Sequence, residues 1–476
     1  MRLTMKFGGT SVGSAQRIRE VAGLVHEAVD QGHQVVVVVS AMSGVTDALI
    51  KAARTAADGD SATYRATRDD LLVRHWQVAR DVAAPHETAA LSDEIRTALD
   101  YLENLCRAIH VLGEVTPRAL DLIASLGERF TASLTAAALR AQGQPAEAVL
   151  ATELIQTDAN YGAATPNLTV TRDKTRAHLL PMLDAGRVPV VTGFMAATEN
   201  GHVTTLGRGG SDYSGSIIGA ALDSDEVWIW TDVDGILTAD PRVVPDAQTL
   251  PSVSFSEAAD LAYYGAKVLH PKSILPAVER DIPIRIKNTF NPSHPGTLVI
   301  SRSEANGRTV KAITAIKDLS LVTVEGKGML GVPGVAAKVF GAVADAGVNV
   351  LMISQSSSEQ SICFTVLAES SARVVASLER AFELELARRN IDRIAAQDGV
   401  GIVSVVGAGM KAVPGIAGKV FGALGRAGIN VISIAQGSSE HTMSMVLAET
   451  DLTRAVQGIH AEFELGRPVA EALAVS

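Results

Sequence analysis

A lysine and two glycines follow the first β-rich segment of the chain, and together they could bind phosphate. Lys6-Phe-Gly-Gly-Thr-Ser11 continues that segment directly, and Gly13 comes close behind. Glycine lets backbone amides approach phosphate, a helix that starts there adds the positive end of its dipole, and Lys6 adds a full charge. The spacing is not the G-x-x-x-x-G-K-[ST] of a P-loop. The segment is therefore another kind of phosphate cradle or an ordinary strand-turn-helix connection.

A second glycine cluster surrounds a cation and a carboxylate. Leu206-Gly-Arg-Gly-Gly-Ser-Asp-Tyr-Ser214 opens a predicted helix of small residues that reaches Ala221. Three glycines and Arg208 make a nest of amides with a planar cation, which suits phosphate or carboxylate. Asp212 falls in the first helical turn, where capping is the ordinary role of an acidic residue. Its closeness to Arg208 and Ser211 keeps a functional role open.

Three further polar segments are candidates for the same site. Thr231-Asp-Val-Asp-Gly-Ile-Leu-Thr-Ala-Asp-Pro-Arg242 ends a predicted strand with a loop of acceptors and turn formers, although each aspartate alone fits a solvated turn. Another predicted strand ends at Ser40, with Thr46 soon after it, and Glu128 lies in a helical stretch. Ligands of open α/β sheets gather at the carboxyl ends of strands, so nucleotide contacts from the Thr231–Arg242 segment are plausible.

The elements that must position these residues alternate in type. In the first 300 residues, short β-branched runs alternate with helical stretches, which predicts a mainly parallel sheet covered on both faces. From Thr46 to Gln142 the apolar spacing stays helical and predicts a helical lobe beside the sheet. The segment Asn288 to Asn306, rich in Asn, Pro, Ser and Gly, is the best candidate boundary. The predicted strands include Gln34 to Ser40, Val188 to Thr192, Val227 to Thr231 and Ile282 to Lys287.

An internal repeat follows that boundary. Val332-Pro-Gly-Val-Ala-Ala-Lys-Val-Phe-Gly341 returns 81 residues later as Val413-Pro-Gly-Ile-Ala-Gly-Lys-Val-Phe-Gly422. Each copy reads β-α-β-β-α. The same offset relates Gly347-Val-Asn-Val350 to Gly428-Ile-Asn-Val431, and Gln355-Ser-Ser-Ser-Glu359 to Gln436-Gly-Ser-Ser-Glu440.

The second copy ends without a final strand. Lys311 to Ile316 precedes the first copy and corresponds at the same offset to Asp392 to Gln397, which precedes the second. We therefore expect Lys311 to Ile316 to complete the sheet of the second copy, with the first copy inserted within it. The predicted domains are residues 1–300, residues 318–398, and residues 309–317 together with 399–476.

Each repeat also contains a glycine pattern that is typical of dinucleotide sites. Gly326-Lys-Gly-Met-Leu-Gly331 and Gly407-Ala-Gly-Met-Lys-Ala412 lie between a predicted strand and a helix. Such a site needs an acidic residue at the end of the second strand to hold the ribose, but Gln355 and Gln436 occupy that region. The pattern alone is a weak signal, and we do not predict NAD binding.

Composition excludes several classes of protein. The 476 residues are 47% apolar and 20% charged, with a net charge of -10, which suits a soluble globular protein and argues against nucleic acid or anionic membrane as a partner. The two cysteines, Cys106 and Cys363, lack metal-ligand spacing and fit a reducing compartment. The sequence shows no targeting segment and no membrane span, so we expect a cytoplasmic protein.

Taken together, these segments resemble the aspartate kinases, members of the amino-acid kinase superfamily with C-terminal tandem ACT domains. The resemblance covers nearly the whole chain and implies the amino-acid kinase fold with two ferredoxin-like βαββαβ ACT domains. The motifs, in the family's order, are KFGGTSV at Lys6, VSAMSGVT at Val39, SLGERF at Ser125, LGRGGSDYS at Leu206, WTDVDGILTADPRVV at Trp230 and YGAKVLHP at Tyr264.

The resemblance implies a reaction: phosphorylation of the β-carboxylate of L-aspartate by ATP with Mg²⁺ to give 4-phospho-L-aspartate, the first step of aspartate-family amino-acid biosynthesis. The acceptor carboxylate has a pKa of roughly 4, so no general base is needed at neutral pH. Catalysis then rests on neutralising the phosphoryl oxygens and holding two anions in line.

The resemblance also assigns roles, with no residue as a dedicated metal ligand. Lys6 and Asp212 are catalytic. Leu237 stands where the family often has a tyrosine beside the adenine. Aspartate is held by Ser40, Thr46, Glu128, Arg208 and Ser211. ATP is bound by Lys6, Gly8, Gly9, Thr231, Asp232, Leu237, Arg242, Lys267 and Val268.

ACT domains bind free amino acids between paired copies, which implies feedback regulation and a homodimer or tetramer. We favour threonine over lysine as the effector because Gln recurs in both copies, although one or both copies could serve only to dimerise. The effector positions are Asn349, Ile353 and Gln355 in the first copy, and Asn430, Ile434 and Gln436 in the second.

Two other functions compete with this reading. A glutamate or carbamate kinase would share the fold but usually lacks the tandem ACT tail. An amino-acid sensor without catalysis gives no reason for Lys6, Arg208 and Asp212 to occur together. The chain ends soon after the second repeat, so we expect no fused homoserine dehydrogenase.

Overall fold

The computed structural model describes residues 1–265, 269–301, 308–356, 360–437 and 439–467. They divide into two compact units. The first comprises Met1–Ile236, Pro251–Ala259 and Lys267–Ser303. The second comprises Leu237–Leu250, Asp260–Ala266 and Glu304–Ser476. The chain therefore passes between the units several times.

The first unit is built on an eight-stranded sheet. Its strands are β1 (Arg2–Phe7), β2 (Gln34–Val39), β3 (Ala146–Val149), β5 (Val188–Thr192), β8 (Glu226–Thr231), β9 (Ser252–Ser254), β10 (Ile284–Asn288) and β11 (Thr297–Ile300). They lie in the order β3-β5-β2-β1-β8-β10-β11-β9. All neighbours from β3 to β10 are parallel, and β11 is antiparallel to β10. This confirms the predicted mainly parallel sheet.

Alternation along β1 directs its side chains to two different layers. Leu3, Met5 and Phe7 belong to a buried cluster with residues of α1 (Ala15–Asp30) and α6 (Leu126–Ala141). Thr4 and Lys6 point to the opposite face, which α7 (Leu168–Asp184) and α8 (Gly210–Ala221) cover through a second apolar cluster. Lys6 is thus the one buried charged residue of β1, on the face that meets α8.

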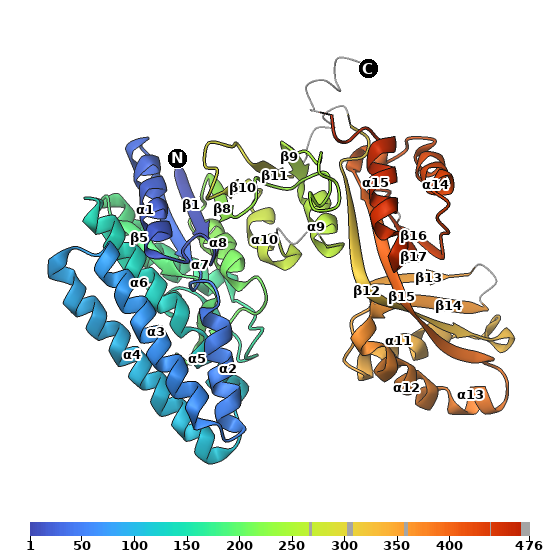
Figure 1. Cartoon of the computed structure of the whole chain (residues 1–476), viewed down its shortest axis with the longest axis horizontal. Helices are drawn as coiled ribbons and strands as arrows, with labels where there is room; N and C mark the ends of the chain where they lie inside the picture. Colours follow the sequence, from blue (N-terminus) through green and yellow to red (C-terminus); the bar gives the residue numbers. More distant parts are fainter. Residues whose placement is uncertain (266–268, 302–307, 357–359, 438, 468–476) are drawn as a thin grey trace. The chain divides into compact units, whose positions relative to one another are not determined.

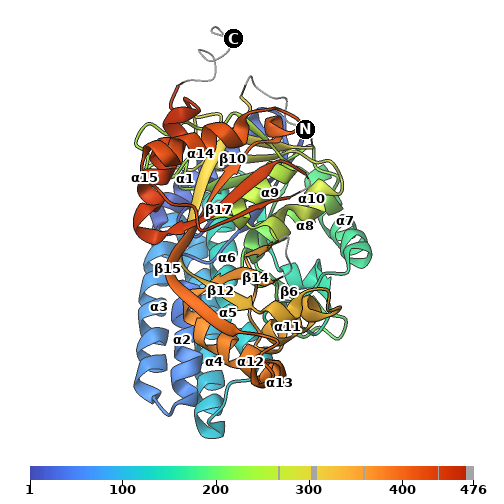
Figure 2. The ribbon, with the colours of Figure 1, turned by 90° about the vertical axis from the view of Figure 1, so that its right-hand side faces the viewer.

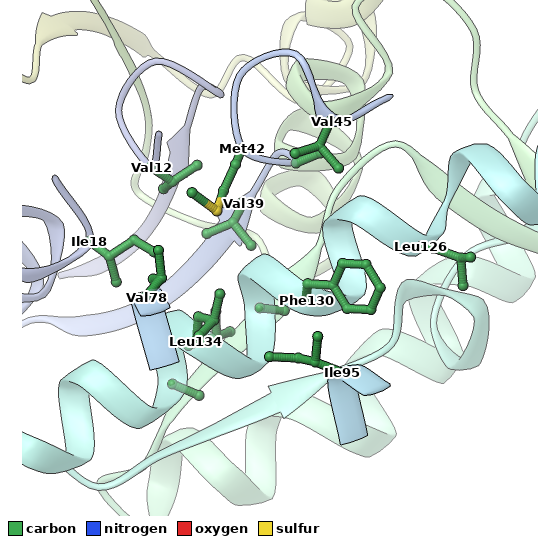
Figure 3. Packing of buried hydrophobic residues seen from close by; sticks show 14 of the residues in the cluster. Val12, Ile18, Val39, Met42, Val45, Val78, Ile95, Leu126, Phe130 and Leu134 are labelled. Atoms are coloured by element: carbon green, nitrogen blue, oxygen red, sulfur yellow. The ribbon is translucent and has the colours of Figure 1, made fainter. Parts of the chain in front are cut away.

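The helical lobe occupies the expected part of the chain. It consists of α2 (Val45–Ala57), α3 (Ser61–Val82), α4 (Pro85–Leu112), α5 (Pro117–Ala124) and α6. The helices α2, α3 and α4 lie side by side (Figure 2). Phe130 and Leu134 of α6 pack with Ile95 and Val78 of this lobe and with Val39 at the end of β2 (Figure 3). The lobe and the sheet therefore share one core.

Helix α8 packs unusually close to the sheet because glycines line its inner face. A Cβ on Gly219 would lie 2.5 Å from Val227 Cγ2, and a Cβ on Gly215 would lie 3.1 Å from Lys6 Cβ. The two glycines are four residues apart and therefore share one face of the helix with Asp212, three residues before Gly215. The close packing brings the first turn of α8 next to β1.

The segment Asn288 to Asn306 is more than a linker. Strand β11 lies within it and pairs with β10 through Ile286 and Thr297. A Cβ on Gly296 would lie 1.9 Å from Ile286 O, so the turn before β11 depends on glycine at φ +75°. The first unit therefore includes the β-branched run Thr297–Ile300, and the division between the units falls near the end of the segment.

The second unit contains a six-stranded antiparallel sheet. Its strands are β12 (Ala312–Glu325), β13 (Met352–Gln355), β14 (Ser361–Leu367), β15 (Arg393–Val406), β16 (Ser433–Gln436) and β17 (Thr442–Ala448), in the order β13-β14-β12-β15-β17-β16. Ala312–Ile316 pairs with Ile402–Val406, and Leu321–Glu325 pairs with Arg393–Gln397. The register shifts between these two halves. Each long strand therefore serves both repeats.

Helices cover the two ends of this sheet separately. The helices α11 (Val335–Asp345), α12 (Ser371–Ala381) and α13 (Glu383–Ala387) lie beside one end, and α14 (Ile416–Arg426) and α15 (Leu452–Glu462) lie beside the other (Figure 1). Val339 and Leu378 are buried in the first of the two cores, and Val420 and Ile459 in the second. None of the helices in the described ranges is long and apolar enough to cross a membrane.

A segment from the middle of the chain forms part of the second unit. Thr238 O accepts a hydrogen bond from Ile313 N of β12 at 2.8 Å, and Thr238 Oγ1 lies 3.0 Å from His460 Nε2 of α15. Ala239 and Val244 are buried in the same cluster as Ile459. The loop that follows β8 is thus anchored on the second repeat, a non-local contact that the sequence did not predict.

The glycine face of α8 gives a stability prediction. Gly219→Ala places a methyl group against Val227 and should destabilise the protein by about 1–3 kcal/mol. The control is Gly23→Ala on α1, an exposed position where a Cβ meets nothing within 4 Å. That change should raise stability by roughly 0.5–1 kcal/mol because alanine favours helix. Urea unfolding measures both, and equal effects would contradict the close packing of α8.

Candidate functional site

The carboxyl ends of four neighbouring strands meet at one edge of the first sheet. The amide of Gly8 donates to β8 at 3.1 Å, the amide of Ser40 donates to β1 at 3.1 Å, and the amide of Gly193 donates to β2 at 2.8 Å. The chain thus leaves β1, β2, β5 and β8 at the same level. Loops from distant parts of the sequence are brought together there, as expected for a ligand site in an open α/β sheet.

Lys6 and Asp212 form an ion pair at this edge. Their side chains are 9% and 17% exposed, so solvent screens the pair less than it would a surface pair. Lys6 lies one residue before the end of β1, and Asp212 lies in the first turn of α8. The pair fixes the direction of an ammonium group at the edge where an anionic ligand would bind. The sequence-predicted association of these two motifs is therefore present.

The loop after β1 packs closely against the loop after β2. A Cβ on Gly9 would lie 2.8 Å from Ala41 O, so no other residue fits there without a shift. Gly9 O accepts a hydrogen bond from Ser43 N at 3.2 Å. The loop after β2 is anchored in the core by Val39, Met42 and Val45, whose side chains are buried (Figure 3). Both loops are therefore fixed relative to Lys6.

Glu128 is buried at the start of α6. Its Oε1 accepts a hydrogen bond from Ala41 N at 3.1 Å, and its Oε2 has no partner among the described residues. Burial raises the pKa of Glu128 to about 8, although the Ala41 amide and the positive charge of Lys6 act in the opposite direction. An unpaired oxygen on a buried carboxyl group is costly, which makes Glu128 suited to receive a cationic group of a ligand.

The remaining predicted substrate residues surround this edge. Ser40 follows β2, and Thr46 lies in the first turn of α2 behind Gly44, which has φ +79°. Ser211 lies against Gly193, where a Cβ would come within 2.8 Å of Ser211 Cβ. Arg208 is exposed, and its guanidinium has no ion-pair partner within the described ranges.

Only some of the residues predicted to bind the nucleotide lie in the first unit. Thr231 ends β8, and its Oγ1 donates to Asp232 Oδ1 at 3.1 Å. Asp234 accepts hydrogen bonds from Asn288 and Asn291 at 2.9 and 3.1 Å. These bonds fit the ordinary explanation for an aspartate in this loop, that of a turn residue.

Two other residues predicted to bind the nucleotide lie in the second unit. Leu237 forms a β-bridge with Thr249 in the second unit, and Arg242 there pairs with Asp240 at 2.7 Å. The predictions for Lys267 and Val268 fall on residues outside the described ranges.

Asp121 was not singled out by any motif in the sequence. It lies on α5 and is 3% exposed, yet it accepts three hydrogen bonds from residues distant in sequence. Its one local signal is an acidic residue set among the apolar residues Leu122, Ile123 and Ala124, one helical segment before Glu128. That signal does not identify its partners.

Sequence comparisons identify the family. The sequence model of the amino acid kinase family matches residues 1–288, and that of the ACT domain matches residues 322–382 and 403–463. Aspartokinase 2 of Arabidopsis thaliana, a chloroplastic protein, is 33% identical over 475 residues, which cover 96% of this chain and 84% of that protein. The chain belongs to the aspartate kinase family.

Other aspartate kinase relatives are similar over the same length. The crystal structure of Escherichia coli aspartokinase III in complex with aspartate and ADP has a TM-score of 0.81 at 29% identity, and the match covers 97% of this chain and 99% of that one. Bifunctional aspartokinase/homoserine dehydrogenase 1 of Zea mays is 37% identical over 97% of this chain but 50% of its own length. The chain spans about half the length of several such bifunctional relatives.

The predicted effector positions of this aspartate kinase family member lie on the two edge strands of the second sheet. Ile353 on β13 and Ile434 on β16 are 49% and 45% exposed. The two strands approach each other, because Ser354 Oγ donates to Ile434 O at 3.2 Å. Gln355 and Gln436 end their strands and are exposed. Asn349 and Asn430 precede the same strands and are also exposed.

Tyr263, at the end of α9 (Phe255–Tyr263), contacts the chain beside the first effector position. Its hydroxyl donates to Val350 O and Leu351 O at 3.1 and 3.2 Å and also hydrogen-bonds the Asn349 side chain. Burial is the main reason why the pKa of Tyr263 lies above its usual value. The motif YGAKVLHP, which includes predicted nucleotide residues, thus begins at Tyr264, directly after Tyr263.

The donor set suits a metal ion that arrives with the nucleotide. Within the described ranges, no group of three or more His, Cys, Asp or Glu residues could hold a metal ion. Asp212 lies next to the predicted phosphate loop, but Lys6 engages it. Mg²⁺ is commonly bound by substrate phosphates, water and one or two carboxylates, which this arrangement allows.

The raised pKa of Glu128 predicts a pH-dependent stability. The carboxyl group titrates near 4.5 when exposed and near 8 when folded, so its contribution to stability is full below pH 4.5 and is lost as pH rises toward 8. Glu128→Gln removes this titration. Thermal scans without ligand should give similar melting temperatures near pH 5, and a variant more stable by about 2 °C or more at pH 8. Parallel pH profiles would mean that Glu128 is ionised in the folded protein.

Proposed function

We propose that this protein catalyses the transfer of the γ-phosphoryl group of ATP to the β-carboxylate of L-aspartate. The observation that carries the proposal is the Lys6–Asp212 ion pair beside the Gly8–Gly9 turn, in a chain of the aspartate kinase family. E. coli aspartokinase III, which binds aspartate and ADP, supports the choice of substrates. The product is 4-phospho-L-aspartate, the first intermediate of aspartate-family amino-acid biosynthesis.

Aspartate binding rests in this proposal on charge complementarity. Arg208 has no ion-pair partner among the described residues and can hold the α-carboxylate bidentately. Glu128, with its free Oε2, receives the ammonium group and becomes ionised when it does so. Ser40, Thr46 and Ser211 supply hydroxyl groups around the β-carboxylate. That carboxylate is ionised at neutral pH and attacks without a general base.

The phosphoryl group is met by charge and backbone amides. Lys6 Nζ and the amide of Gly9 stabilise its oxygens as charge develops on them, and Asp212 orients Lys6. Mg²⁺ supplies further neutralisation of the phosphates when the nucleotide is bound. The nucleotide itself is held by Thr231, Asp232, Leu237, Arg242, Lys267 and Val268. Leu237 in place of a tyrosine leaves adenine packing to aliphatic contact.

We further infer three domains, with limits at 1–300, 318–398, and 309–317 joined to 399–476. The pairing of Ala312–Ile316 with the second repeat supports the insertion of the first repeat within the second. Threonine or lysine is the proposed feedback effector, bound at Asn349, Ile353 and Gln355 and at Asn430, Ile434 and Gln436. A relative that was crystallised with lysine and aspartate, E. coli aspartokinase III, supports an amino-acid effector.

The exposed isoleucines on β13 and β16 support a dimer or tetramer through the repeats. A cytoplasmic location stays a prediction from cysteine usage, since the described cysteines are unpaired.

An aspartyl-hydroxamate assay with ATP and Mg²⁺ tests the proposal. Hydroxylamine traps the acyl phosphate only if a carboxylate was phosphorylated. Aspartate should give product and glutamate should not, which separates this activity from that of a glutamate kinase. A protein with no aspartate-dependent product, but with threonine or lysine binding, would be a sensor without catalysis.

Replacement of the lysine isolates its charge. Lys6→Met keeps a long apolar side chain against Gly215 and removes the ammonium group, so kcat should fall by about 10²-fold or more. The KM for aspartate should change little because Lys6 faces the phosphoryl group. Circular dichroism and effector binding serve as controls for folding. Wild-type turnover in this variant would remove Lys6 from the mechanism.

Tyr263 should connect effector binding to catalysis. Tyr263→Phe loses the hydroxyl contacts with Val350, Leu351 and Asn349. We expect the effector concentration for half inhibition to rise by about 5-fold or more, since the coupling free energy in such systems is typically about 1–3 kcal/mol. Uninhibited kcat should stay unchanged. The matched control is Tyr264→Phe, whose hydroxyl has no partner among the described residues. Identical inhibition curves for the two variants would contradict this role.

A further inference from the structure

Asp121 is a buried carboxylate that the proposed chemistry does not use. Its Oδ2 accepts hydrogen bonds from Gly162 N at 2.9 Å and Thr205 N at 2.8 Å, and its Oδ1 accepts from Thr205 Oγ1 at 2.8 Å. A buried carboxylate is costly unless donors surround it. Three donors from two separate segments converge on Asp121, so it ties α5 to both.

One of these segments leads directly to Arg208. Thr205 ends β7 (Val203–Thr205), three residues before the arginine. The next residue, Leu206, donates from its amide to Phe194 O at 2.9 Å. Gly207, at φ +79°, packs so closely that a Cβ would lie 3.0 Å from Gly162 O. Asp121 thus holds both the start of the Arg208 turn and the loop on which that turn rests.

Asp121 is also connected to the helix that carries Glu128. Asp121 O accepts a hydrogen bond from Ser125 N at 3.1 Å, and Ser125 is both the last cap of α5 and the first cap of α6. Glu128 lies in the first turn of α6. The backbone of Asp121 therefore connects to the helix that carries Glu128, while its side chain connects to the turn that carries Arg208.

We propose that Asp121 is a positioning residue that fixes the separation of Arg208 from Glu128 and thereby sets the affinity for the amino-acid substrate. This inference rests on the proposed function, in which those two side chains hold the carboxylate and the ammonium group of aspartate. A substrate with both charges on one carbon demands a fixed distance between its two partners. Neither residue touches the other among the described contacts, so a third group must set that distance.

The donors around Asp121 require a side chain with acceptor oxygens. Asp121→Ala removes both oxygens and leaves the buried amides of Gly162 and Thr205 without this acceptor. The Arg208 turn should then move relative to α6. We expect the KM for aspartate to rise by about 10-fold or more, with the KM for ATP changed by less than about 2-fold.

Three control variants separate positioning from general stability. Glu226→Ala removes a half-buried carboxylate that pairs with Arg285 at 3.0 Å at the amino end of β8, the edge opposite the site. It should lower the melting temperature and leave the KM for aspartate unchanged. Thr205→Val removes only the hydroxyl donor to Asp121 and should raise the KM for aspartate moderately. Thr205→Ser keeps that donor and should have the wild-type KM for aspartate.

The experiment measures the KM for aspartate, the KM for ATP, kcat and melting temperature for the full-length wild type and these variants. A wild type without aspartate-dependent turnover would overturn the proposed function itself. With an active wild type, a KM for aspartate in Asp121→Ala that stays at the wild-type value, or rises equally in Glu226→Ala, would overturn the role of Asp121. If Asp121→Ala does not fold, the pair Thr205→Val and Thr205→Ser decides the question, and equal KM values for that pair would overturn it.

Discussion

The close approach of α8 to β1 is the constraint on which the rest of the site depends. Glycine at positions 215 and 219 lets the helix come near the strand, and Asp212 reaches Lys6 across the layer. A charged group buried at the end of a strand is costly without a partner. The ion pair with Asp212 supplies that partner and fixes the direction of the Lys6 ammonium group. Parallel pairing then places the loops after β2 and β5 at the same level as Lys6.

The second unit is joined to the site through the chain itself. The loop after β8 contains Thr231 and Asp232 in the first unit, and within a few residues it is anchored on α15 and β12 of the second unit through Thr238. Helix α9 likewise begins in one unit and ends in the other at Tyr263. Both connections are therefore parts of the chain itself.

Most helices and strands could be predicted from local signals in the sequence. The features that were missed depend mainly on contacts between residues that are far apart in the sequence. Lys6, Asp212 and the glycine turns were identifiable because phosphate chemistry needs those residue types next to strand ends. The interleaved pairing was foreseeable from the 81-residue offset, because a repeat that lacks its last strand must obtain one elsewhere. Asp121 was missed because its partners, Gly162 and Thr205, are far away in sequence and carry no motif. The same is true of Thr238, whose partner His460 lies 222 residues away. The strand β11 was missed because Pro and Gly nearby resembled a linker.

The most direct test of the account is a crystal structure of the protein with ADP, Mg²⁺, L-aspartate and a fluoride complex that mimics the transferring phosphoryl group. The mimic should lie within hydrogen-bonding distance of Lys6 Nζ and of the Gly9 amide. Arg208 should contact the α-carboxylate, Glu128 Oε2 should contact the ammonium group, and the β-carboxylate should be in line with the mimic. A mimic bound away from Lys6, with the Lys6–Asp212 pair remote from the nucleotide, would contradict the account.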